Sequence, residues 1–297
     1  MQEIHEFRVD YEHAHLLFGK NEGKNIDKMV KVVRLTREDP RFERVGELNK
    51  MLADKKDDPF FYSWEVMFKY TPAELKDASL FYFRPVTWFE PAGEECGTVY
   101  DEQSACPICG ANAKRIGALR LKASSIPHKD IASTIAGEHI VSDRFIKAFK
   151  KHKLKGASFR PVLFTKRTTK QYYEIVPESP ELKVSEKTLV GVDPFDFSEG
   201  SEAREDYIEG ADYLLKQEKE VYKCPKGHLI GLNLLSEPHV KKHRALHSFD
   251  LFRTREKVGV RRGLLRPEAL DICSPAFRDM VMAEKLTGFK FEIAHVG

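Results

Sequence analysis

The chain has 297 residues, of which 41% are hydrophobic and 11% aromatic, a composition that can bury a substantial core and argues against a disordered protein. No apolar run of about 18 residues occurs, which excludes a membrane-spanning helix, and we expect no membrane partner. The first residues, MQEIHEFRVDYEH, carry acids and no apolar stretch, so we expect no signal peptide. Five cysteines are an odd number and two stand at metal-ligand spacing, which favours a reducing, cytoplasmic location over a disulfide framework.

The net charge of +3 conceals three blocks of opposite sign. Residues 111–170 hold fifteen Lys/Arg and three Asp/Glu, residues 178–220 hold five and thirteen, and residues 240–268 hold nine and three. Such blocks can neutralise one another across surface loops. Alternatively, they can form a basic face beside an acidic loop, which would attract an acidic partner or nucleic acid. The sequence leaves both interpretations open.

The first predicted element is a helix that begins near Asp39. Asp39 is a good N-cap and Pro40 suits the first helical position. Val45, Leu48 and Leu52 then fall on one face at helical spacing. We therefore expect an amphipathic helix packed on a core.

Two aromatic strands are predicted next. In FFYSWEVMFKY every second residue from Phe60 to Tyr70 is aromatic or branched, and a second aromatic strand follows at residues 80–89. Between the two strands, Thr71 and Glu74 have the spacing of a capping box for a short helix. An aromatic stripe can stack nucleic-acid bases, but we interpret this one as the buried face of a sheet.

The most specific short motif is the turn Cys106-Pro-Ile-Cys109-Gly110. Thiolates at positions i and i+3 of a tight turn can reach one metal ion, and a following glycine lets backbone N–H groups approach the sulfurs. The spacing predicts a zinc ligand pair. A redox pair would be expected to open a helix after a strand, and no such context is visible here.

Zinc requires two further ligands, and the sequence offers three candidates. Cys96 lies in the same turn-rich segment, and Cys224-Pro-Lys-Gly-His228 is a second turn of similar character. Either Cys96 and Cys224 or Cys224 and His228 complete a set of four. Participation of both Cys96 and Cys224 is favoured slightly, since a half-used turn would be unusual. Four protein ligands would make a closed, structural site.

Residues 140–159 and 272–291 form an internal repeat at an offset of 132, with seven identical positions of twenty. Each copy predicts a strand end, a helix and a following strand. Ser142 and Ser274 are the predicted N-caps. Cys273, at the position of Val141, is expected to be a small buried side chain. Just before the first copy, residues 128–135 suggest a short helix.

No catalytic motif is recognisable: the chain lacks a P-loop, GxGxxG, GxSxG and HExxH. His239, His243 and His247 recur at every fourth position, which on a helix would place three imidazoles on one face and suggest a metal site. We interpret them as part of a solvated polar face. An enzyme of unrecognised type stays an alternative, without a nameable catalytic residue.

Three stretches carry a resemblance to a known family: CPICGANAKRIGALRL, KDIASTIAGEHIVSDRF, and LKGASFRPVLF with QYYEIV. They resemble the bacterial double-CXXCG motif proteins, and the repeated serine-capped helix is similar to immunity proteins of polymorphic toxin systems. The resemblance covers residues 96–176 and, more weakly, 222–296. It implies an intracellular protein that neutralises a cognate toxin. This chain departs from the family in having one complete CXXCG, with CPKGH where a second such turn would serve.

Taken together, these patterns predict an α+β fold of mixed sheets and short flanking helices, with a zinc-knuckle insertion and the internal repeat. We expect an N-terminal α+β region over residues 1–95 and a second domain over 96–297. The leading hypothesis is an immunity-type binding protein with a structural zinc. Its expected partner-binding residues are charged: Asp193, Asp196, Glu199, Glu202, Arg261 and Arg262.

The alternative binding function is recognition of nucleic acid by a zinc ribbon. Its basis is the basic run KAFKKHKLKGASFRPVLFTKRTTK together with five arginines, namely Arg253, Arg255, Arg261, Arg262 and Arg266. Neutralising several phosphates would make such binding steeply dependent on salt.

Overall fold

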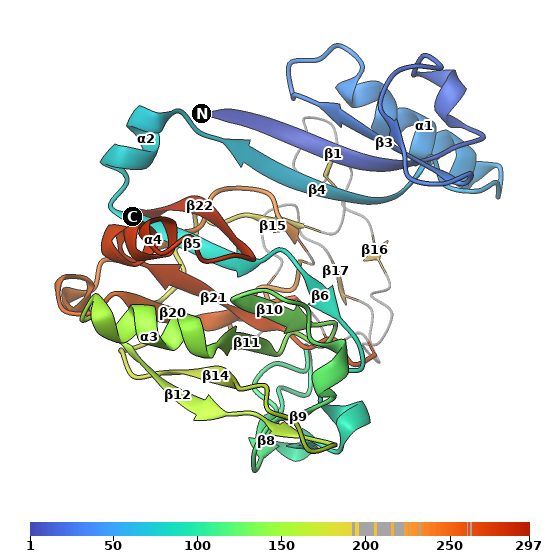
Figure 1. Cartoon of the computed structure of the whole chain (residues 1–297). Helices are drawn as coiled ribbons and strands as arrows, with labels where there is room; N and C mark the ends of the chain where they lie inside the picture. The colour runs from blue at the N-terminus through green and yellow to red at the C-terminus, as the bar shows by residue number, and fades with distance from the viewer. Residues whose placement is uncertain are drawn as a thin grey trace. The chain divides into compact units, whose positions relative to one another are not determined.

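The structure is a computed structural model that describes residues 1–191, 194–195, 205–206, 215–216, 223–224, 226–231, 233–259, 261 and 263–297. It has the expected α+β class (Figure 1). The chain divides into two compact units, residues 1–77 with 191–202, and residues 78–190 with 203–297. This boundary differs from the expected one at residue 95, because the strand at 80–85 pairs only with strands of the second unit. Among the described helices none has both the length and the apolarity to span a bilayer.

The first unit is a four-stranded antiparallel sheet with one helix on it. The sheet order is β2 (Lys24–Asn25), β3 (Val30–Leu35), β1 (Gln2–Asp10) and β4 (Phe61–Lys69). Helix α1 (Phe42–Asp54) buries Val45, Leu48 and Leu52 as predicted, although it begins two residues after Pro40. The capping box at Thr71 and Glu74 is confirmed at the start of α2 (Pro72–Asp77).

A β-bulge changes which aromatic face of β4 is buried. The register with β1 pairs Arg8 with Ser63 but Val9 with Phe61, so Tyr62 is the extra residue. Phe61 is therefore buried, while Tyr62 is 45% exposed and donates its hydroxyl to Asp10. The expected unbroken alternation from Phe60 to Tyr70 is wrong at this point.

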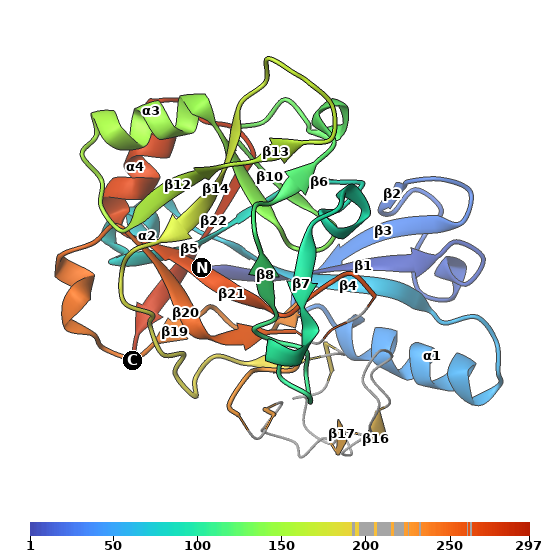
Figure 2. The same ribbon diagram turned by 90° about the horizontal axis from the view of Figure 1, so that it is seen from below.

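The second unit contains two five-stranded sheets and two helices (Figures 1 and 2). The first sheet has the order β12 (Ala157–Pro161), β14 (Tyr172–Pro177), β11 (His139–Ser142), β10 (Ile131–Thr134), β6 (Trp88–Phe89). The second has the order β19 (His239–Val240), β22 (Phe289–Val296), β5 (Leu80–Pro85), β21 (Glu268–Cys273), β20 (Leu251–Val258). The aromatic stretch 80–89 thus passes from one sheet to the other. Residues 131–134, expected to be helical, are a strand.

Short strands complete the described elements. They are β7 (Val99–Asp101), β8 (Lys114–Ile116), β9 (Arg120–Leu121), β13 (Leu163–Phe164), β15 (Val190–Gly191), β16 (Glu205–Asp206), β17 (Leu215–Lys216) and β18 (Asn233–Leu234).

The internal repeat is confirmed and extends further than the sequence indicates. The first copy is β11, α3 (Asp143–Lys151) and β12, and the second is β21, α4 (Pro275–Ala283) and β22. In each sheet a strand from outside the repeat separates the repeat's two strands: β14 in the first and β5 in the second. On the other side of the repeat's first strand, β10 pairs with β11 in the first sheet and β20 pairs with β21 in the second, both antiparallel. Two four-stranded antiparallel units with one helix each therefore form the core of the second unit.

The two helices lie side by side and close the core between the repeats (Figure 2). Ser142 caps α3 and Ser274 caps α4, each accepting a backbone N–H as predicted. Phe145 and Phe277 are fully buried, and their ring centroids lie 5.9 Å apart. Cys273 is fully buried, as expected.

Asp130 connects the first copy to the second. Its carboxylate accepts the hydroxyl of Ser142 at 2.8 Å and the backbone N–H of Thr287 at 2.8 Å. Its own backbone N–H donates to the carbonyl of Thr287 at 3.0 Å. This aspartate therefore joins the cap of α3 to the loop that follows α4.

Asp250 makes the same connections in the opposite direction. It accepts the hydroxyl of Ser274 at 2.8 Å and the backbone N–H of Lys155 at 2.8 Å. Its backbone N–H donates to the carbonyl of Lys155 at 2.8 Å. Because each copy holds the other through equivalent atoms, the copies are arranged as in a twofold pair.

Candidate metal centre

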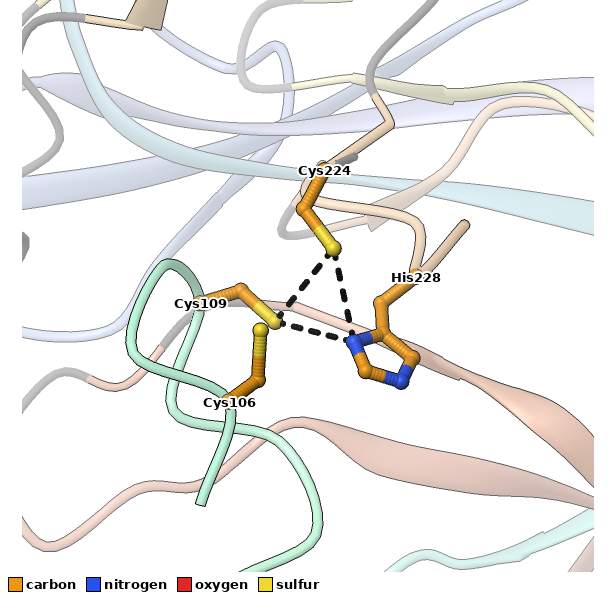
Figure 3. A group of neighbouring side chains, drawn as sticks. All are labelled: Cys106, Cys109, Cys224 and His228. Atoms are coloured by element: carbon orange, nitrogen blue, oxygen red, sulfur yellow. Dashed lines mark hydrogen bonds between the residues drawn. The ribbon is translucent and has the colours of Figure 1, made fainter. Parts of the chain in front are cut away.

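The first turn of the site lies between β7 and β8. The backbone N–H of Gly110 donates to the carbonyl of Cys106 at 2.9 Å, and that of Cys106 donates to Ala111 at 2.6 Å. Gly110 has φ of 74°, and a Cβ there would lie 2.5 Å from the side chain of Arg261. This turn directs the sulfurs of Cys106 and Cys109 to the same side (Figure 3).

The second turn is supplied by the CPKGH sequence. The backbone N–H of Cys224 donates to the carbonyl of His228 at 2.9 Å, and that of Gly227 donates to Cys224 at 2.7 Å. Leu229 forms a parallel bridge with Val258 at the end of β20. Arg261, three residues after the end of β20 along the chain, donates its backbone N–H to the carbonyl of Cys109 at 2.9 Å. The end of β20 therefore contacts the second turn, and Arg261 beyond it contacts the first.

Four side chains meet between these turns: Cys106, Cys109, Cys224 and His228, all buried, with their ligand atoms within 4.8 Å of one another (Figure 3). The Sγ atoms of Cys109 and Cys224 are 4.0 Å apart, and Nδ1 of His228 lies 3.3 and 3.4 Å from them. In a tetrahedron with ordinary zinc bond lengths these separations would be about 3.8 Å between sulfurs and about 3.6 Å from sulfur to nitrogen. The group can hold a metal ion.

The electrostatics of the group also suit a cation. Burial raises the pKa of Cys109, and the neighbouring sulfurs of Cys224 and Cys106 raise it further. Burial also opposes ionisation of Cys106, but N–H groups of Cys109 and Ile108 lower its pKa overall. Burial, followed by nearby lysines, lowers the pKa of His228 and keeps its ring neutral for ligation. A bound metal cation would attract all three thiolates and so offset the repulsion between neighbouring sulfurs.

Asn112 contacts the ring of His228 from the side away from the sulfurs, with its Nδ2 at 3.1 Å from Nε2. Ligation through Nδ1 leaves the proton on Nε2, which then needs an acceptor. The amide of Asn112, turned end for end, presents Oδ1 for that purpose. The ligand spacing gave no sign of Asn112, although it lies only two residues after the CPICG turn.

The structure does not bring Cys96 into the group. Cys96 ends a short 3-10 helix, Glu94–Cys96, is only partly buried, and is absent from the set of residues that converge on one point. The ligand set that contains Cys96 is therefore corrected in favour of the set with His228. The Glu94–Cys96 turn instead packs beside β9.

Of the expected partner-binding residues, Arg261 alone is described. It pairs with Glu102 beside the candidate metal centre. The other five lie outside the described residues: Asp193, Asp196, Glu199, Glu202 and Arg262. Within the acidic block of residues 178–220, Phe195 packs in the core of the first unit against Phe42, so this block does not lie wholly on the surface.

The three histidines of the period-four pattern do not share a helix. His239 lies on β19, and His243 precedes the short 3-10 helix Arg244–His247 and accepts the backbone N–H of Ala245. A metal site on one helix face is therefore wrong for these residues.

Three of the five arginines proposed to meet nucleic acid instead contact carboxylates of the fold. Arg262 lies outside the described residues. Of the four described arginines, Arg255 is the one without an ion pair to a described residue. The pairs are Arg253 with Asp271, Arg261 with Glu102, and Arg266 with Glu94 and Glu102. The acids in these pairs lie outside the acidic block of residues 178–220, which pairs with the basic block of residues 240–268 through Glu186 and Lys241.

Comparison with known proteins adds no relative: no protein-family model and no curated protein matches this chain significantly. The Cys₃His geometry therefore carries the functional argument.

Proposed function

We propose that the Cys₃His group binds one structural zinc ion that joins the two turns. The supporting observation is the donor set: three sulfurs and one imidazole nitrogen lie within 4.8 Å of one another, and Cys109, Cys224 and His228 are at nearly tetrahedral separations. When four protein ligands surround zinc, no position stays open for a water or a substrate. Such an ion stabilises the fold because it connects residues 106–109 to residues 224–228.

The zinc proposal is tested by metal analysis of the purified chain. We expect one zinc per chain, loss of the metal in Cys224→Ser, and retention in the matched control Cys96→Ser. Replacement by Co²⁺ should give the intense visible bands of a tetrahedral thiolate site. A metal-free wild-type chain, or a Cys96→Ser variant that loses zinc, would contradict the proposed ligand set.

We further propose that the zinc-stabilised chain is an immunity-type binding protein that neutralises a cognate toxin inside the cell. The support is the pairing of CPICG with CPKGH in one site, because the second turn then serves where the double-CXXCG proteins, which the sequence resembles, have another CXXCG. Binding proteins of this kind act by covering an active surface, with charge complementarity that speeds association.

The neutralisation proposal is tested with the protein encoded beside this one in the source genome. Expressed alone it should arrest growth, and coexpression of this chain should restore growth and yield a stoichiometric complex after nuclease treatment. A neighbouring protein that is harmless, or whose toxicity persists despite abundant chain, would reject the proposal. Co-purification that disappears after nuclease treatment would favour the nucleic-acid alternative.

A further inference from the structure

A basic cleft in the second unit lies outside the metal centre. It has a volume of about 450 Å³ and is lined by Glu181, Lys183, Lys241, Lys242, His243 and Arg255. These residues come from three segments that are distant in sequence. Four of the six side chains are permanent cations and one is a carboxylate.

Strand pairing explains why the cations converge. Residues 182–184 form β-bridges with both edge strands of the second sheet. Leu182 pairs with Thr254 on β20, and Val184 pairs with Val240 on β19, so this segment lies between the two edge strands. Leu182, Val240 and Thr254 have no exposed surface. Since successive side chains on a strand point to opposite faces, the next residues, Lys183, Lys241 and Arg255, face outward on neighbouring strands. Strands about 4.8 Å apart place these three cations within reach of one ligand.

The cleft contains cations that have no ion-pair partner among the residues that the structure describes. Lys241 forms an ion pair with Glu186 at 2.7 Å. Lys183, Lys242 and Arg255 are exposed and make no ion pair with any residue the structure describes. His243 uses Nδ1 to accept the N–H of Ala245, so the neutral ring keeps its proton on Nε2 as a donor. Like charges gathered in a concave surface attract a multiply charged anion.

The lining indicates the class of anion. Among the described residues that line the cleft none is Phe, Tyr or Trp and His243 has the single ring, which disfavours recognition by base stacking. Its volume falls in the range of small-ligand sites, about 300–1,000 Å³, and is too compact for a long polyanion. Phosphate groups carry up to two charges and several acceptor oxygens, which lysine and arginine bind well. We propose that this cleft binds a small, multiply charged anion of the phosphate class through Lys183, Lys242 and Arg255.

The test is calorimetric titration of the zinc-loaded full chain with pyrophosphate at low ionic strength. Wild type should bind, and affinity should fall as NaCl is added. Lys183→Glu/Arg255→Glu should weaken binding by about tenfold or more, equivalent to about 1.4 kcal/mol. The matched control Lys166→Glu/Arg167→Glu changes the charge equally at exposed positions outside the cleft and should bind like wild type.

Several results would overturn the assignment. These are no binding by wild type at millimolar pyrophosphate, an equal loss in the control variant, or tighter binding of hexaglutamate or duplex DNA than of pyrophosphate. Zinc content and circular dichroism establish that each variant is folded. Should the charge reversal misfold, Lys183→Gln/Arg255→Gln provides the same comparison with a smaller expected loss.

Discussion

Substituting Gly156 by alanine tests how the two repeat copies hold each other. Gly156 has φ of 109°, which L side chains rarely adopt, and an added Cβ would lie 2.4 Å from the carbonyl oxygen of Leu251. The obstacle is backbone, so it cannot be relieved by rotating a side chain. One of the two segments must therefore move.

The expected cost has two parts. An unfavourable backbone conformation costs about 1–3 kcal/mol. Separating the segments also weakens the hydrogen bonds from the N–H groups of Asp250 and Leu251 to the carbonyl of Lys155, now 2.8 and 3.2 Å, each contributing about 1 kcal/mol. We expect Gly156→Ala to lower the free energy of unfolding of the second unit by about 2–5 kcal/mol.

Gly117→Ala is the matched control, because Gly117 has φ of 82° but no atom within 4 Å of an added Cβ. Gly117→Ala should therefore lower the free energy of unfolding only by the cost of the unfavourable backbone conformation, about 1–3 kcal/mol. Gly288 is the counterpart of Gly156 in the second copy, with its Cβ 2.3 Å from the carbonyl oxygen of Ile131, and should behave like Gly156. Urea unfolding followed by circular dichroism measures all three variants. Equal losses for Gly156→Ala and Gly117→Ala would refute the close-approach argument.

Three further predictions follow from contacts within the second unit. Asn112→Ala should raise the zinc dissociation constant by about 10–100-fold in competition with a chromophoric chelator, and an unchanged constant would exclude a role in orienting the imidazole. Ser274→Ala removes a helix cap and the bond to Asp250, and should lower stability by about 1–2 kcal/mol in urea unfolding; a wild-type midpoint would contradict this. Burial alone would lower the pKa of His139, but its hydrogen bond to Asp271 helps raise it to about 9 from an ordinary 6.5. The stabilisation is then complete below about pH 6.5 and is lost as the pH rises through about 9, so His139→Gln should flatten the pH dependence of thermal unfolding, and a wild type already flat over that range would be inconsistent with this reasoning.

Local features of this chain were readable from sequence because neighbouring residues decide them. The caps Ser142 and Ser274 and the capping box at Thr71 depend on side chains three residues from the N–H groups they satisfy. The i, i+3 spacing of Cys106 and Cys109 likewise predicts that both sulfurs reach one point. The α+β class followed from the change between helical and strand periodicity.

Features that depend on pairing between distant segments were not readable in this way. The bulge at Tyr62 reverses the buried face of β4 only because β1 sets its register. The structural duplication exceeds the repeat in the sequence because β14 follows its copy along the chain, whereas β5 precedes its own copy, so no single offset aligns them.

The candidate metal centre depends both on local sequence patterns and on pairing between distant segments. The sequence offered five possible ligands and left two complete sets open, with joint participation of Cys96 and Cys224 slightly favoured. Tertiary structure decided between them, because the end of β20 pairs with Leu229 next to the CPKGH turn, and Arg261 shortly after β20 bonds to Cys109 of the CPICG turn. Residues 115 apart in sequence thus meet at 4.0 Å, which no local pattern can encode.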